Sequence, residues 1–172
     1  MTYSTKRWTA SARRASICGA MLAFAAALVP RTAPAEVTGD YAQDLAQVYG
    51  AHQRILAIKD ACDKAVPKAR RAADEAYAHW KARNRQVLEE LDQRVTAMIR
   101  GASRDERELA RNVGKYEGEM LRQRRLATEV FLEQPEPRVA RLCKEFPGTL
   151  ASPDTDLKKA YAAELRAIRE QR

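Results

Sequence analysis

Apolar residues recur at spacings of three and four along most of the chain, and this pattern is the main constraint on its fold. The stretch from Tyr41 to Cys62 shows the pattern first, and Asp40 precedes it as an expected N-cap. No stretch alternates β-branched and polar residues, and neither Asn-Gly nor Asp-Gly occurs. The sequence therefore predicts an all-α protein.

Proline and glycine divide this pattern into separate helices. Pro67 ends the first helix and fits the first turn of a second helix, which Gly101 ends. The string from Ser103 to Glu106 matches a capping box for a third helix, because Ser and Glu side chains at this spacing bond the first free amides. Gln134 and the prolines after it close the third helix.

The remaining residues predict one short helix and one long helix. Helical spacing continues over 139–146, Pro147-Gly148 and Ser152-Pro153 bracket an expected loop, and a last helix is expected over 154–170. The turns between the first three helices are short, so consecutive helices should run up, down and up. We expect an up-down helical bundle of four long helices plus one short helix, with a disulfide at one end.

The first 35 residues match a secretory signal peptide. Basic residues precede an apolar stretch, Ile17 to Val29, and Ala33-Pro34-Ala35 is a small-x-small cleavage site. Thirteen apolar residues are too few to cross about 30 Å of hydrocarbon as a helix, so a membrane anchor is not expected. We expect export to the periplasm or the medium by the general secretory route. Cleavage near Ala35-Glu36 would leave a single domain over 36–172.

Removal of the signal peptide changes the electrostatic character of the chain. The full sequence has 31 basic and 23 acidic residues and a formal net charge of +8. Residues 1–35 hold five of the basic residues and no acidic one, so the remaining chain carries a formal +3. A nucleic-acid-binding domain needs a basic surface on the folded part. No nucleic-acid partner is therefore expected.

Two cysteines, Cys62 and Cys143, remain after loss of Cys18 with the signal peptide. An even number of cysteines in an exported chain indicates a disulfide, and two cysteines allow one intramolecular pairing. Cys62 lies at the end of the first helix and Cys143 follows the third, so both belong to the same end of the expected bundle. No metal site is expected, since no C-x-x-C occurs and neither cysteine has a nearby histidine.

Motifs for common chemistry are missing from the sequence. It has no Gly-rich phosphate loop, H-E-x-x-H, G-x-S-x-G or haem-attachment motif, and its two histidines are His52 and His79. His52 lies on the inward stripe of the first helix and is the candidate ligand or acid-base residue. Its alternative role is a hydrogen-bonded histidine at the bundle wall. No cofactor and no catalytic residue are assigned.

The string Trp80, Arg83 and Asn84 is the candidate interaction site, because Trp and Arg dominate binding energy at many interfaces. Its alternative is a core tryptophan with Arg83 at its rim and Asn84 bonded to a neighbouring helix. Gly114 and Gly118 interrupt the third helix, and they permit either close helix packing or a bend.

The function expected from these features is non-enzymatic binding, with another protein of the cell envelope as partner. The chief alternative is a bundle that holds a small ligand or cofactor through His52. Signal peptide, helices and disulfide together resemble, as a class, the small exported helical immunity proteins that neutralise cell-wall-degrading toxins. That resemblance implies a toxin-neutralising role as a further alternative. The sequence leaves the oligomeric state open.

Overall fold

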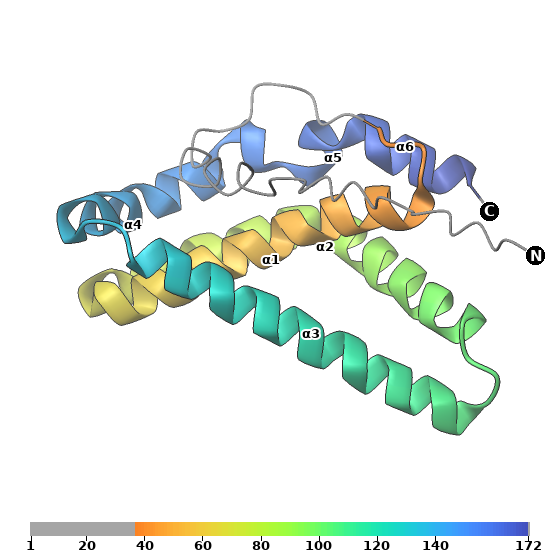
Figure 1. Cartoon of the computed structure of the whole chain (residues 1–172). Coiled ribbons are helices and arrows are strands. Elements are labelled where there is room, and N and C mark those ends of the chain that lie inside the picture. Colours follow the sequence, from red (N-terminus) through yellow and green to blue (C-terminus); the bar gives the residue numbers. More distant parts are fainter. Residues whose placement is uncertain (1–36, 172) are drawn as a thin grey trace, which may run out of the picture. The chain divides into compact units, whose positions relative to one another are not determined.

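A computed structural model describes residues 37–171, which fold into helices joined by short turns (Figure 1). Its elements are α1 (Tyr41–Ala65), the 3-10 turn η1 (Pro67–Ala69), α2 (Arg70–Gly101), α3 (Glu106–Leu132), α4 (Glu136–Ala151), the 3-10 turn η2 (Pro153–Thr155), α5 (Leu157–Ala160) and α6 (Ala162–Glu170). No strand occurs among residues 37–171, and the all-α helical bundle is confirmed. The predicted signal peptide and its cleavage site lie outside the described residues.

Helix α1 lies in the middle of the arrangement and packs against α2, α3, α4 and α6 (Figure 1). The larger core cluster joins α1, α2 and α6, with Val48, Trp80, Leu91 and Ile168 all fully buried. A smaller cluster surrounds the disulfide, where Phe131 of α3 meets α1 and α4. Burial of apolar area stabilises the fold by roughly 25 cal/mol per Å². The helices are thus held mainly through α1.

The helix starts follow capping chemistry, with one difference from expectation. Asp40 caps α1 as predicted, and its carboxylate accepts the Gln43 N–H at 2.9 Å. Helix α3 is capped by Asp105 instead of Ser103, because the Asp105 carboxylate accepts the Glu108 N–H at 2.8 Å. The Ser103 hydroxyl donates instead to the carbonyl of Ile99 in the last turn of α2. The capping sequence was therefore placed two residues too early.

Helix α4 is longer than the expected short segment and continues through Pro147 to Ala151. A proline inside a helix removes one backbone donor, so the Cys143 carbonyl loses its usual helical partner. Phe146 and Leu150 flank the proline and are both buried, and continuing the helix keeps them on its inner face. This burial offsets the missing hydrogen bond, and the expected loop at Pro147-Gly148 is wrong.

The expected last helix over 154–170 is divided into η2, α5 and α6. Tyr161 leaves the helical conformation, with φ −126° and ψ 34°, and separates α5 from α6. Asp156 caps α5 by accepting the Lys158 N–H at 3.0 Å. The break turns the chain so that Leu157 and Leu165 both reach the core.

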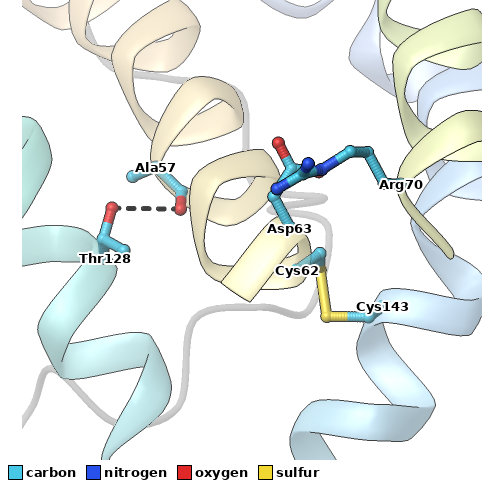
Figure 2. Close-up of a disulfide and its surroundings, with 6 residues drawn as sticks. All are labelled: Ala57, Cys62, Asp63, Arg70, Thr128 and Cys143. Carbon is cyan, nitrogen blue, oxygen red and sulfur yellow. Dashed lines mark hydrogen bonds and ion pairs between the residues drawn. A yellow bond between two sulfur atoms is a disulfide. The ribbon is translucent and has the colours of Figure 1, made fainter. Parts of the chain in front are cut away.

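The predicted disulfide between Cys62 and Cys143 is present and joins α1 to α4 (Figure 2). The two Cα atoms lie 5.3 Å apart, within the range that disulfides require. Nearby, the Thr128 hydroxyl of α3 donates to the Ala57 carbonyl of α1 at 3.2 Å (Figure 2). Covalent and hydrogen bonds therefore fix α3 and α4 to the second half of α1.

Candidate functional site

Trp80 and Asn84 lie in the interior of the protein, with no exposed surface. The Trp80 indole N–H donates to the Thr155 carbonyl of η2 at 2.8 Å. The Asn84 side chain donates to the Trp80 carbonyl at 2.9 Å and accepts the Leu157 N–H at 2.8 Å. This burial contradicts the expectation that Trp80 and Asn84 face a partner. They hold the segment between α4 and α6 against α2.

Arg83 is exposed, yet its guanidinium also serves this segment. It donates to the Leu150 carbonyl at 2.7 Å, near the end of α4. The last carbonyls of a helix have no donor within the helix, and the Arg83 guanidinium supplies a donor to one of these carbonyls. Arg83 is therefore engaged with the protein's own backbone, and the three residues of the string share one structural role.

His52 lies among aromatic side chains from α1 and α2. Its Nε2 is 2.9 Å from the Tyr77 hydroxyl, and its ring stacks on Trp80 with the centroids 5.7 Å apart. Burial, together with the positive charges of Lys81 and Arg124, lowers the pKa of His52 to about 4. The imidazole is therefore neutral at pH 7, and a ligand at Nε2 would have to replace the tyrosine.

Two further tyrosines extend this aromatic cluster toward α3. Tyr49 of α1 lies beside Tyr116 of α3, with ring centroids 6.2 Å apart. Burial, together with the nearby Tyr49 and Asp92, raises the pKa of Tyr116 to about 12. Burial also raises the pKa of Asp92. Both tyrosines remain protonated at neutral pH, so the cluster supplies hydroxyl groups and no phenolate nucleophile.

Sequence reasoning missed three polar residues that are buried: Asp44, Thr128 and Glu164. Asp44 belongs to α1 and Glu164 to α6, and Gln47 donates to the Glu164 carboxyl at 3.2 Å. Carboxylates are almost never fully buried unless paired, so a sequence reading assigns them to the surface. One signal was available, because Asp44 and Glu164 each stand directly before an inward leucine.

The side of α3 that faces away from α1 is the most apolar exposed surface on a described helix. Of five exposed large apolar side chains among residues 37–171, three belong to α3: Leu121, Leu126 and Val130. At 3.6 residues per turn, Leu126 and Val130 lie one turn apart on the side opposite the buried Thr128 and Phe131. Leu121 stands seven residues before Thr128 and lies on the same side of the helix as Thr128. We name the surface opposite Thr128 and Phe131 the outer face of α3; its residues are Arg122, Leu126, Glu129 and Val130.

Gly118 lies about one turn before Leu121 and Gly114 about two turns before it, and both glycines are exposed. A Cβ atom added at either glycine would meet nothing within 4 Å, and neither has a positive φ. No helix of the described chain packs on them, and α3 continues through both without interruption. The expected close packing at these glycines is not found within residues 37–171.

Two open grooves lie beside α6 and do not contain His52 or Trp80. One has a volume of about 650 Å³ and is lined by Tyr41, Glu90 and Arg94, among others. The other has a volume of about 710 Å³ and is lined by Glu90, Lys158 and Arg166, among others. Arg169 and Arg94 bond to Glu90 and hold the pKa of its carboxyl below the usual value. Glu90, which lines both grooves, is thus paired with Arg94 and Arg169.

Residues 37–171 contain no group of three or more His, Cys, Asp or Glu side chains placed to hold a metal ion. In the same part of the chain, no helix combines the length and apolar character needed to cross a membrane. No protein family, curated protein or solved structure matches the chain.

Proposed function

We propose that the protein is an exported, non-enzymatic helical bundle that binds another protein of the cell envelope through the outer face of α3. The observation that carries this proposal is the adjacency of Leu126 and Val130 on that face, where they are 42% and 54% exposed. Apolar side chains rimmed by charged residues are typical of protein–protein contact surfaces.

The chemistry of this face favours a helix or loop of a protein as its partner. Arg122 pairs with Glu119 at 2.7 Å and Glu129 with Arg125 at 3.8 Å, so these charged side chains are held along the helix beside Leu126 and Val130. Arginine and apolar anchors together are the residues that carry most binding energy at protein interfaces.

Export and a non-enzymatic role are supported by other features. The N-terminal pattern and the Cys62–Cys143 disulfide both favour an oxidising compartment outside the cytoplasm. The inward histidine, His52, is neutral and already bonded to Tyr77. General acid-base chemistry needs a titrating group with access to substrate. These features favour binding over catalysis.

Photo-crosslinking in cells that export the protein tests this proposal. A photoreactive phenylalanine analogue is placed at Leu126 or Val130, and Met98 of α2 serves as the matched control because it is also an exposed large apolar residue. We expect one protein partner to crosslink from both α3 positions and not from Met98. The substitution Leu126→Asp should reduce the yield at Val130 by about tenfold, as loss of an interface anchor does.

Crosslinks of equal yield from Met98 would show that the outer face of α3 is not a specific surface. The same conclusion would follow if Leu126→Asp left the yield at Val130 unchanged. Leu126 is exposed, so the variant should keep its stability within about 0.5 kcal/mol. A circular dichroism melt of the variant checks that the fold is retained.

A further inference from the structure

The carboxyl group of Asp44, in the first turn of α1, is buried, and 0% of the residue's surface is exposed. It has no ion-pair partner among the basic residues of 37–171. Burial of a carboxylate without a cation is costly, because the group loses its hydration and gains no opposite charge in return. The position of Asp44 therefore calls for a positive charge that the described side chains do not supply.

The hydrogen bonds of Asp44 leave one of its two oxygens without a partner. Asp44 Oδ1 accepts both the backbone N–H and the hydroxyl of Thr38, each at 2.8 Å. Asp44 Oδ2 is buried and has no hydrogen-bond partner within residues 37–171. An orphaned buried acceptor is rare in folded proteins and requires an explanation. Oδ2 is therefore open to a further donor.

Both donors to Asp44 come from the short segment that precedes α1. Thr38 contributes its N–H and its hydroxyl, and the same hydroxyl accepts the Asp40 N–H at 3.2 Å. These bonds hold the segment against the first turn of the helix. The carboxylate of Asp44 therefore lies where the chain enters α1, next to the N-terminal end of the described residues.

The expected signal-peptide cleavage creates a positive charge close to this segment. A signal peptidase that hydrolyses the Ala35–Glu36 peptide bond with water leaves a carboxylate on Ala35 and an ammonium group on Glu36, which is mostly protonated at neutral pH. Glu36 is two residues before Thr38, and two residues of extended backbone span at most about 7 Å. The Thr38 nitrogen is 2.8 Å from Asp44 Oδ1, so the covalent chain allows the ammonium group to reach Oδ2.

The other charged groups around Asp44 do not supply this cation. Glu164 of α6 is also buried, and burial, together with the negative charge of Asp44, raises the pKa of Glu164. Arg94 of α2 and Arg169 of α6 both pair with Glu90, at 3.1 and 2.6 Å. An ammonium group from the chain terminus is the donor of matching charge that the sequence places nearest to Oδ2.

We propose that removal of the signal peptide creates the cation that Asp44 lacks, so that the ammonium group of Glu36 bonds Asp44 Oδ2 and locks the start of the processed chain onto α1. The proposal rests on the export and cleavage proposed above, and it does not depend on the outer face of α3. Before cleavage the nitrogen of Glu36 is a neutral amide, so the ion pair forms only in the processed protein.

Amine labelling of the exported protein tests this ion pair. Intact mass first establishes that the exported chain begins at Glu36. A succinimidyl acetate at neutral pH should then acetylate the Glu36 α-amine about tenfold more slowly in the wild type than in Asp44→Asn, because only the unprotonated amine reacts and pairing keeps it protonated. Peptide mass spectrometry measures the rates. Asp40→Asn is the matched control, since Asp40 is exposed and asparagine keeps the N-cap, and its labelling should stay as slow as in the wild type.

Insertion of two glycines between Ala35 and Glu36 provides a second test that leaves every described residue unchanged. Cleavage after Ala35 then separates the ammonium group from Thr38 by two further residues, and its labelling should be faster than in the wild type. Equal labelling rates in the wild type, Asp44→Asn and the inserted protein would overturn the ion pair and leave the proposed export intact. An exported chain that begins at another residue would overturn the proposal through its cleavage site, and an unprocessed chain would contradict the export itself.

Discussion

At the scale of single residues, one buried amide fixes the direction of the chain after α4. Asn84 bonds through its nitrogen to the Trp80 carbonyl and through its oxygen to the Leu157 N–H. The second bond supplies an acceptor to an N–H at the start of α5, where no helical acceptor is available. A side chain of α2 thereby caps this N–H, whereas at α1 and α3 the capping side chain comes from the residue directly before the helix.

Replacement of this amide should therefore be costly. Asn84→Ala leaves the Leu157 N–H buried without an acceptor, and we expect the free energy of unfolding to fall by about 1–3 kcal/mol. Asn112→Ala is the control, since Asn112 is half-buried and bonds only to the Ser103 hydroxyl. Urea unfolding followed by Trp80 fluorescence measures both. Equal losses in the two variants would show that the bond to Leu157 contributes nothing specific.

His52 makes a second prediction at this scale. Its pKa of about 4 in the folded state lies below the ordinary value, so the unfolded chain binds the extra proton first as pH falls. Stability should decrease from about pH 6.5 to pH 4, by about 2 kcal/mol because the ring is only partly buried. NMR titration of the imidazole measures the pKa directly. His52→Gln should remove this decrease, and an unchanged decrease would assign it to other groups.

At the scale of the elements, most of α3, including its two glycines, makes no tertiary contact that would determine the residue type at each position. Only Leu109, Thr128 and Phe131 of α3 are buried, so most of the helix depends on its own backbone bonds and its charge pairs. A glycine in such a helix costs about 1 kcal/mol relative to alanine. Gly114 and Gly118 lower the stability of α3 without any contact that requires them.

We therefore expect Gly114→Ala and Gly118→Ala to raise the free energy of unfolding by up to about 1 kcal/mol each. Gly39→Ala is the opposite control, because Gly39 has φ +78° and should lose stability when a side chain is added. Thermal unfolding by circular dichroism measures all three. Destabilisation by either α3 variant would contradict the open environment of that glycine.

The helices also show how much of the fold can be predicted from the sequence. Helix identity follows from apolar spacing, which is why α1 to α3 are found with errors of only a few residues. The angle between α3 and α1 determines which of two neighbouring residues is buried. Apolar spacing alone therefore does not distinguish the buried Thr128 from the exposed Ala127 beside it. Pro147 was taken as a helix end because its lost hydrogen bond is visible in the sequence, whereas the burial of Leu150 is not.

The candidate site shows even more clearly that packing and long-range contacts cannot be predicted from the sequence. Trp80, Arg83 and Asn84 were recognised as unusual, but their partners are carbonyls and an N–H of residues far along the chain, which no local pattern reveals. Asp44 and Glu164 were overlooked because acidic residues on a helix ordinarily face solvent. Residues of unusual type can be found from sequence, whereas long-range partners come only from the fold.

At the scale of the whole molecule, the disulfide restrains a long loop that includes α2 and α3. It joins residues 81 positions apart, and the chain-entropy description gives about 4.5 kcal/mol as the upper limit of its contribution. We expect the double variant Cys62→Ala/Cys143→Ala to lose about 2–4 kcal/mol. Urea unfolding of the oxidised protein and of this variant measures the difference. Free thiols in the unreduced, denatured protein would contradict the assignment.

The position of α1 among its neighbours has a consequence for the order in which the chain assembles. Helix α1 buries Val48 in the same cluster as residues of α6, and Gln47 meets its partner 117 positions later. Closing so long a loop is slow, and its cost precedes the contacts that offset it. A nascent chain that ends before α6 therefore leaves the α6-facing side of α1 uncovered, so residues 37–171 reach their packed arrangement only after α6 has been synthesised.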